Sequence, residues 1–229
     1  AAEQGHPAAQ NNLGLSHRKG EGVPKYLEEA ARWFRLAAEQ GYPDAAYSLG
    51  LAYARGEGVL QDSARAVKWL HKAAEQGEVN AMHRLARELH KKAEKKAEFR
   101  EAARWYRAAA DKDHLDAMYY LAQLHSDGTG VAENFVEAAA WLLKAAEQFH
   151  APSQCELGRR HFAGQGVPPN PAEGAKWFRR AADQGHEHGR DQVLQADDLV
   201  VGAEHVAPQE ALRSRMRVGL GRVRSRLHL

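Results

Sequence analysis

Hydrophobic residues recur along the chain with a fixed step of 36 residues. The tryptophans, one leucine position and a pair of adjacent alanines all keep this step. The positions are Trp33, Trp69, Trp105, Trp141 and Trp177; Leu13, Leu49, Leu85, Leu121 and Leu157; and the pairs that begin at Ala37, Ala73, Ala109, Ala145 and Ala181. Several residue types in one phase indicate a tandem array of structural repeats.

Within each repeat, the polar and apolar positions predict two amphipathic helices. In the second copy, Ala45, Leu49 and Tyr53 are four residues apart, which places them on one side of a first helix. Apolar residues in 66–73 recur at intervals of three and four residues and predict a second helix, with Trp69 on its buried side. The repeating unit is therefore a helical hairpin.

Glycines and capping residues mark the ends of these helices. Glycine pairs are expected to form the turn inside each hairpin, in "GEGV" at 20–23 and 56–59, "GTGV" at 128–131 and "GQGV" at 164–167. Asn134 and Asn170 each precede a glutamate by three residues, as helix N-caps do. Gly41, Gly77 and Gly185 are suited to the left-handed position that ends the second helices. Asp113 and Phe149 replace glycine there, and because phenylalanine tolerates this conformation poorly, we expect the link after 145–149 to depart from the common geometry.

The segment "AAYSLGLAYARGEGV" (45–59) resembles the Sel-one-like repeat (SLR) family, a relative of the tetratricopeptide repeats. The resemblance covers residues 1–188 and implies an all-α fold, a right-handed superhelical solenoid of 36-residue helix-turn-helix repeats. It further implies a bacterial scaffold or adaptor that holds other proteins. Each hairpin in such an array buries its apolar stripe against its neighbours.

The two ends of the array are irregular. Residues 1–7 match 37–43, so we expect the chain to begin at the end of a second helix, with a part missing before it, and the uncapped ends could self-associate. Residues 189–229 are expected to hold a degenerate cap, with a first helix at 189–201, and a basic tail. A helix is expected at 208–218. The arginines of 213–229 suit either an anionic partner or a solvated tail.

Composition excludes several classes of protein. The 229 residues are 44% hydrophobic and 27% charged, with a net charge of +2, which is too little basic excess to predict a nucleic-acid partner. No apolar run predicts a membrane span. Residue 1 opens without a signal-peptide-like leader, and the compartment stays open between bacterial cytoplasm and periplasm.

No catalytic, cofactor or metal-binding motif was recognised. The segment "GEGVPK" follows a helix and repeats as a connector, so it does not predict a phosphate-binding loop. Cys155, the single cysteine, has no positioned base near it in sequence. The thirteen histidines are interpreted as structural or surface residues; His83 and His90, for example, are two helical turns apart. We therefore expect no enzyme activity, no cofactor and no metal ion.

By resemblance to the tetratricopeptide pattern, residues at −5, −2, +2, +5 and +6 from the repeat leucine face the concave groove. These columns vary between copies and hold six lysines and arginines against three aspartates, which favours a modestly acidic protein or peptide segment. Solvent-facing positions without a binding role would vary between copies in the same way. The alternative that these columns are ordinary exposed surface therefore stays open. The predicted partner-binding residues are Asn11, Tyr47, His83, Arg84, Arg87, Lys91, Lys92, Tyr119, Gln123 and Arg159.

The turn of the third repeat departs most from the pattern. Its glycine positions hold Lys92 and Glu94, and because 89–105 contains good helix formers, we expect the first helix to continue by about one turn and the chain to reverse near 95–98. Lys91, Lys92, Lys95 and Lys96 form either a solvated connector or a basic group at the groove edge.

Three functions are compared on this basis. A non-catalytic adaptor fits the resemblance, while a neutraliser (an immunity-type protein that blocks a bacterial toxin or hydrolase) would have the same sequence features. A peptidoglycan or phosphate hydrolase would need a site that the sequence does not show. The sequence cannot distinguish the adaptor from the neutraliser; the adaptor is our first hypothesis and the neutraliser the alternative.

Overall fold

The computed structural model describes residues 1–94 and 96–193, and all regular secondary structure in these ranges is helical. The predicted all-α fold of 36-residue helical hairpins is confirmed. A helical stretch at 187–193 follows the last hairpin, and the expected helix at 208–218 and tail at 213–229 lie outside the described residues. The helices of the hairpins are α1 (Pro7–Lys19), α2 (Leu27–Glu39), α3 (Pro43–Arg55), α4 (Ser63–Glu75), α5 (Val79–Lys92), α6 (Lys96–Ala110), α7 (Leu115–Asp127), α8 (Phe135–Glu147), α9 (Ala151–Ala163) and α10 (Pro171–Asp183).

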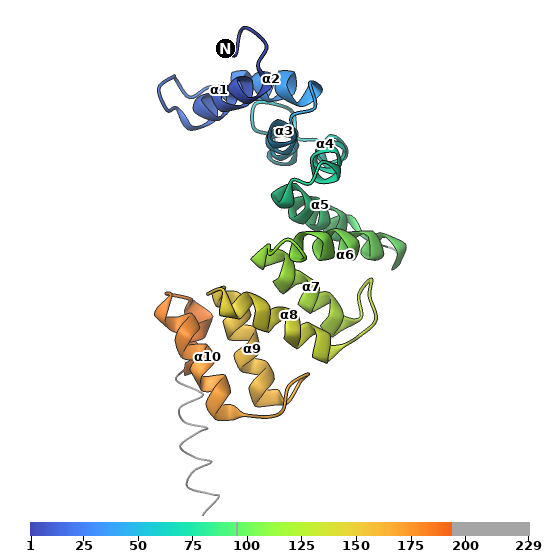
Figure 1. Cartoon of the computed structure of the whole chain (residues 1–229), viewed down its shortest axis with the longest axis vertical. Helices are drawn as coiled ribbons and strands as arrows, with labels where there is room; N and C mark the ends of the chain where they lie inside the picture. The colour runs from blue at the N-terminus through green and yellow to red at the C-terminus, as the bar shows by residue number, and fades with distance from the viewer. Residues whose placement is uncertain (95, 194–229) are drawn as a thin grey trace, which may run out of the picture. The chain divides into compact units, whose positions relative to one another are not determined.

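The chain divides into two compact units, Ala1–Trp141 and Leu142–Leu229. In the first unit, α1 pairs with α2, α3 with α4 and α5 with α6. Each second helix then packs against the first helix of the next repeat, α2 on α3, α4 on α5 and α6 on α7 (Figure 1). In the second unit, α9 pairs with α10. Val193, in the leucine column, packs against the core of this unit, as the predicted additional first helix requires; residues 194–201 of that helix are outside the described ranges.

The repeat alanines and four of the five repeat leucines form the core, whereas Trp33, Trp69 and Trp141 are half-buried. Leu49, Leu85, Leu121 and Leu157 are at most 1% exposed, and so are the first alanines of all five alanine pairs. Small residues let the paired helices approach closely. A Cβ atom on Gly50 would lie 2.8 Å from Leu70 Cγ, and one on Gly14 would lie 2.6 Å from the Phe34 ring. The hairpin geometry therefore favours a small residue at this column, which is glycine in three repeats and alanine in the other two, at Ala86 and Ala122.

The predicted helix caps are confirmed. The Asn134 and Asn170 side chains accept hydrogen bonds from the backbone N–H groups of Glu137 and Glu173, at 3.0 and 3.1 Å. At the ends of the second helices, Gly41, Gly77 and Gly185 have φ angles of 86°, 92° and 82°, in the left-handed region. These caps stop each helix at the length that the repeat requires.

The two glycines of the hairpin turn have different tasks. The first, Gly56, ends α3 in the left-handed conformation, with φ 72°. The second, Gly58, lies against the start of the previous repeat's second helix, where a Cβ atom would be 2.0 Å from the Leu27 carbonyl oxygen. Gly130 has the same relation to Phe99, at 2.4 Å. The turns of the second and fourth repeats are thus fitted to the backbone of the repeat before them.

The turn of the third repeat takes another path, and our prediction for it was wrong. The helix α5 ends at Lys92, one residue later than the corresponding end of α3 rather than one turn later. Ala93 is extended, with φ −65° and ψ 122°, and α6 begins at Lys96. The second helix gains the extra turn because Glu98, in its first turn, accepts a hydrogen bond from the Glu94 backbone N–H at 2.7 Å.

The junction at Phe149 also contradicts the prediction. Phe149 has φ 63°, and Asp113 has φ 62°, so both take the conformation that glycine takes elsewhere. The N–H of Phe149 bonds to the Ala146 carbonyl and that of His150 to the Ala145 carbonyl, the pattern seen around Gly41. The phenylalanine ring is 77% exposed, so no packing opposes this geometry, and the helix-ending hydrogen bonds maintain it.

Candidate functional site

The face formed by the first helices of the first unit contains two hollows. The α1–α3 hollow, with a volume of about 460 Å³, is lined by Asn11, Leu15, Arg18, Asp44, Tyr47, Ser48, Leu51, Arg55, Glu78 and Asn80. The α5–α7 hollow, about 370 Å³, is lined by Arg84, Arg87, Glu88, His90, Lys91, Tyr106 and Tyr120. Most of these residues come from the columns that the sequence assigned to the groove.

The α1–α3 hollow is balanced in charge and partly aliphatic. Arg18 and Arg55 face Asp44 and Glu78 across it, while Leu15 and Leu51 contribute its apolar surface. Tyr47 is half-buried, and burial, followed by the nearby Glu78 carboxylate, raises the pKa of its hydroxyl. Such a surface offers shape and apolar contact without a strong preference for charge.

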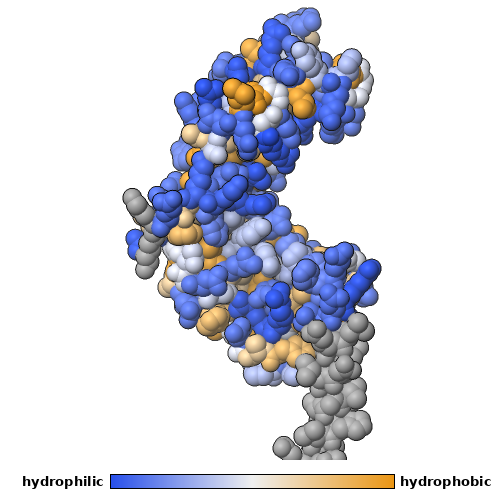
Figure 2. Space-filling view, turned by 180° about the vertical axis from the view of Figure 1, so that it is seen from behind, coloured by the Kyte–Doolittle hydropathy of each residue, from blue (hydrophilic) through white to orange (hydrophobic). Residues whose placement is uncertain are grey.

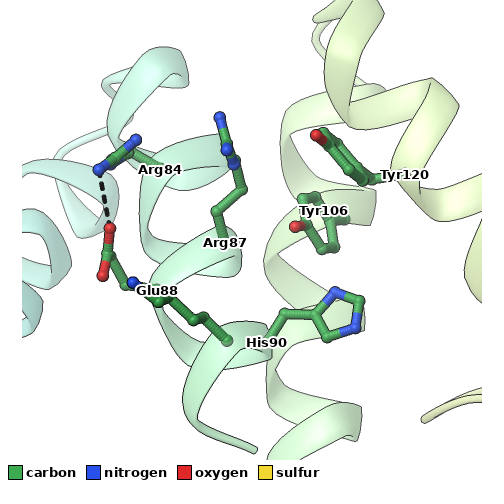
Figure 3. A pocket seen from close by; sticks show the side chains of 7 residues that line it. Arg84, Arg87, Glu88, His90, Tyr106 and Tyr120 are labelled. Atoms are coloured by element: carbon green, nitrogen blue, oxygen red, sulfur yellow. Dashed lines mark ion pairs between the residues drawn. The ribbon is translucent and has the colours of Figure 1, made fainter.

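The α5–α7 hollow is basic. Arg84 forms an ion pair with Glu88 at 2.9 Å, and this pair neutralises the only carboxylate among the lining residues (Figure 3). Arg87 and Lys91 are exposed on the same helix, one turn apart. The two remaining cationic side chains therefore give this hollow a positive charge that an anionic group could neutralise.

Aromatic rings form the other wall of the α5–α7 hollow. Tyr106, from α6, is almost fully buried, and its ring stacks on that of Tyr120, from α7, with centroids 5.4 Å apart. The Arg87 guanidinium lies over the Tyr120 ring, 5.7 Å from its centroid. Burial, and then Tyr120, raises the pKa of Tyr106, so its hydroxyl stays protonated. Arginine and tyrosine together are enriched at the energetic centres of protein interfaces.

The remaining predicted residues have different surroundings. Lys92 is exposed at the end of α5, and Tyr119 and Gln123 are half-buried on α7. Asn11 is only 4% exposed and belongs to the floor of the α1–α3 hollow. Arg159 belongs to the second unit, where it is exposed and pairs with Glu156 at 3.3 Å. His83 is 9% exposed, and its ring packs against that of His114. Lys95 and the side chain of Lys96 lie outside the described parts.

Sequence reasoning missed the two tyrosines of the α5–α7 hollow. Tyr106 follows Trp105 in a column that holds phenylalanine or leucine in the other repeats. The hydroxyl of Tyr106 is the one polar group in that column, and it could have indicated a special role. Tyr120 shares the −1 column with Arg84, Asn12, Ser48 and Glu156. The variability of that column marked it as surface-facing, although it was not assigned to the groove.

Cys155 does not have the environment of a nucleophile. It is 1% exposed, and burial raises the pKa of its thiol, which keeps it in the unreactive protonated form. Figure 2 shows a surface on which hydrophilic residues predominate, with hydrophobic residues in separate patches on the face drawn. Among the described helices, none has both the length and the apolar character to cross a bilayer.

A family model for the Sel1 repeat matches the chain over residues 7–42, 43–78, 79–114, 115–148 and 151–186. Among solved structures, c5321, described as a protective antigen present in uropathogenic Escherichia coli strains and displaying an SLR fold, is 32% identical with a TM-score of 0.82. That match covers 86% of this chain and 42% of c5321, so this chain spans less than half of that protein. A Sel1 repeat protein from Oxalobacter formigenes is also 32% identical, with a TM-score of 0.74, covering 79% of this chain and 74% of that one. A comparison with curated proteins finds no match.

Proposed function

The chain belongs to the Sel1 repeat family, whose members generally mediate protein–protein interaction, and from this premise we propose that it is a non-catalytic adaptor that holds a partner protein on its first-helix face. The observation that carries the proposal is the α5–α7 hollow. There Arg87 and Lys91 are exposed beside the stacked rings of Tyr106 and Tyr120. No catalytic family is indicated, and the fold is typically a scaffold.

The chemistry of the hollow favours a partner segment that carries a carboxylate next to an aromatic or aliphatic side chain. The carboxylate would pair with Arg87 or Lys91, whose charges are not neutralised by the Arg84–Glu88 pair. The apolar neighbour would contact the exposed part of Tyr120, which the Arg87 guanidinium already covers on one side. An arginine held against a ring loses little conformational freedom on binding, which favours tight association.

The segment would continue toward α1 along the first-helix face of the same unit. The α1–α3 hollow supplies Tyr47, Leu15 and Leu51 there, in surroundings of balanced charge. We therefore assign the preference for acidic partners to the α5–α7 hollow, and shape and apolar contact to the α1–α3 hollow. Both hollows lie within Ala1–Trp141, so one rigid surface is sufficient.

Affinity capture from bacterial lysate, followed by direct titration of the captured partner, tests the adaptor. Arg87→Ala combined with Lys91→Ala is expected to weaken binding at least about tenfold, because both unneutralised cations are removed. Arg32→Ala combined with Lys68→Ala is the matched control, since these exposed cations lie on the second helices α2 and α4. Circular dichroism should show unchanged helicity for both double variants.

Equal losses in both variants, or no loss in either, would remove the α5–α7 hollow from the interface. The same experiment separates the adaptor from a neutraliser. A captured hydrolase or toxin whose turnover stops when this chain binds would identify a neutraliser. A partner whose activity is unaffected supports the adaptor.

A further inference from the structure

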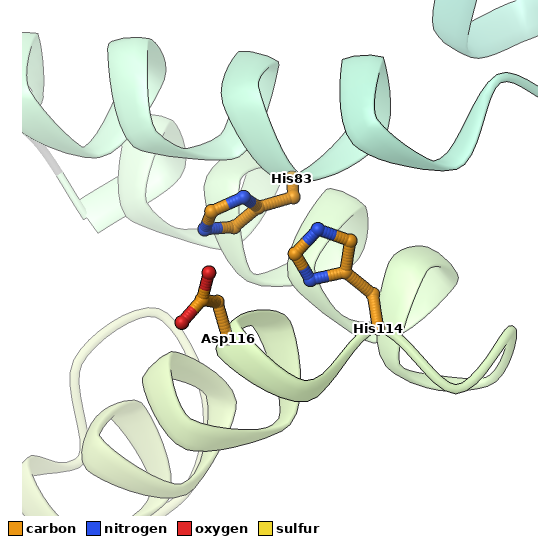
Figure 4. A group of neighbouring side chains, drawn as sticks. All are labelled: His83, His114 and Asp116. Carbon is orange, nitrogen blue, oxygen red and sulfur yellow. The ribbon is translucent and has the colours of Figure 1, made fainter. Parts of the chain in front are cut away.

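Three side chains of metal-ligating type converge between α5 and the N-terminal end of α7. His83 comes from α5, His114 is the N-cap residue of α7, and Asp116 is in the first turn of α7. Figure 4 shows the three side chains pointing toward one another. One ligand atom of each lies within 4.8 Å of the ligand atoms of the other two.

His83 supplies a second, independent indication of a ligand. The side chain is 9% exposed, and its Nε2 atom is buried with no hydrogen-bond partner among the described residues. Buried nitrogen atoms in folded proteins are almost always satisfied by protein, water or an ion. A bound cation facing this atom would satisfy it.

The surroundings place the two imidazole rings side by side. The Ala117 backbone N–H donates a hydrogen bond to His114 Nδ1 at 3.2 Å, which fixes that ring beside His83 with centroids 4.4 Å apart. Because Nδ1 of His114 accepts this bond, its neutral ring carries the proton on Nε2. A metal ion would bind His114 through Nδ1 in exchange for the Ala117 bond, or through Nε2 after the proton moves to Nδ1.

The Asp116 carboxylate is the one anionic group of the set, and Arg84 and Arg87 lie near His83 on α5. Ligand atoms around tetrahedral zinc are about 3.4 Å apart, given Zn–N distances of about 2.0–2.1 Å. The ligand atoms of the set lie within 4.8 Å of one another, so metal binding would require the exposed Asp116 side chain to move closer to the two rings.

We propose that His83, His114 and Asp116 form a binding site for Zn²⁺ or a similar divalent transition-metal ion, with the fourth position open to water. Two imidazoles and one carboxylate are a common zinc donor set. The expectation that the chain lacks metal ligands came from considering each histidine within its own helix. The structure instead joins residues of the third repeat to the first turn of the fourth.

The site has an internal comparison one repeat earlier. The positions 36 residues before the three ligands hold Tyr47, Glu78 and Asn80, which also lie together, in the α1–α3 hollow. That set has one carboxylate and no imidazole, so it is a poor zinc site. The same backbone positions thus hold metal-ligating side chains around the third repeat and do not hold them one repeat earlier.

The test uses the tag-free full chain, stripped of metal with a chelator that is then removed. Calorimetric titration with Zn²⁺ should give one equivalent bound, and Co²⁺ should give the intense visible absorption of a tetrahedral site. His83→Ala and Asp116→Asn should each weaken Zn²⁺ binding at least tenfold. Asp116→Asn keeps the proposal falsifiable if His83→Ala does not fold, because Asp116 is exposed.

The matched control is His186→Ala with His188→Ala, which removes another pair of neighbouring histidines, with ring centroids 5.8 Å apart. This variant should bind Zn²⁺ as the unchanged chain does. Failure to bind one equivalent, or equal binding by the Asp116→Asn chain, would overturn the site, as would loss of binding in the His186/His188 variant alone. Because the readout is the metal itself, a failed adaptor proposal leaves this result unaffected.

Discussion

The second repeat (43–78) and the third (79–114) attach different side chains to the same helical skeleton. Leu49 and Leu85 are both fully buried, and the alanine pairs of both repeats pack into the core. The turn of the second repeat keeps its two glycines, whereas the third has Lys92 and Glu94 there. The difference shows that the core columns are sufficient for the hairpin, while the turn and the first-helix face are free to change.

The changes in the third repeat are concentrated around one surface. The basic side chains of the α5–α7 hollow, the altered turn and the His83–His114–Asp116 cluster all involve α5 or the residues that follow it. The corresponding part of the second repeat has balanced charges and no imidazole. This contrast makes the third repeat the part of the array where specific function is expected.

The largest effect is expected from the turn glycine that the third repeat has lost. Gly58→Ala should lower the free energy of unfolding by about 3 kcal/mol, because the new Cβ would meet the Leu27 backbone and also occupy a left-handed conformation. Urea denaturation followed by circular dichroism measures this. Gly22→Ala, at the same turn position but with nothing within 4 Å, should cost only about 1 kcal/mol.

Glu94→Ala completes this series, since Glu94 occupies the Gly58 position of the third repeat and is exposed. It should change stability by less than about 0.5 kcal/mol. A loss at Glu94 as large as that at Gly58 would show that the two turns depend on the same contact. In that case, the conclusion that the second and third turns make different contacts would be wrong.

Charge reversal at equivalent positions compares the two hollows directly. Lys91→Glu should weaken binding of the captured partner about tenfold at low salt, and the loss should shrink as salt is added. Arg55→Glu, at the equivalent position of the second repeat, should cost no more than about threefold, because Arg55 already pairs with Glu57 at 3.5 Å. Equal losses at both positions would assign the acidic segment to the whole face rather than to α5.

The smallest effect is expected at the repeat junctions, where Gly77 ends the second repeat and Asp113 the third. Gly77→Ala should cost about 1 kcal/mol because its φ is 92°, while Asp113→Gly should add about 0.5 kcal/mol by relieving a left-handed aspartate. Thermal unfolding by calorimetry resolves both shifts. Destabilisation by Asp113→Gly would indicate that the aspartate side chain stabilises the junction more than glycine relieves the backbone.

Much of the fold could be predicted because the repeat supplies five independent copies of each core position. The leucine and alanine columns and the caps at Asn134 and Asn170 are all confirmed. The turn of the third repeat was mispredicted because helix propensity suggested that α5 would continue. Capping by Glu98 instead extended α6. Phe149 was mispredicted because only the backbone cost of a positive φ was considered, whereas the helix-ending hydrogen bonds to Ala145 and Ala146 hold it in that conformation.

The site could be predicted only in part. Columns counted within one repeat located Arg87 and Lys91 at the α5–α7 hollow, and Tyr47 at the α1–α3 hollow. They could not show that His83 meets His114 and Asp116, which are separated from it by about one repeat length. Contacts of this kind form between neighbouring repeats. To predict them, one must know which column of one repeat packs against which column of the next.

The backbone contact made by Gly58 also bears on how such an array can change its length. A turn fitted this closely to the repeat before it tolerates neither an added residue nor a side chain, so sequence can be gained there only in whole repeats. The third turn, with an extended Ala93 and an exposed Glu94, is released from that requirement. We therefore expect this turn to accept a peptide tag, a protease site or a break between two co-expressed fragments while the hairpins on either side are kept.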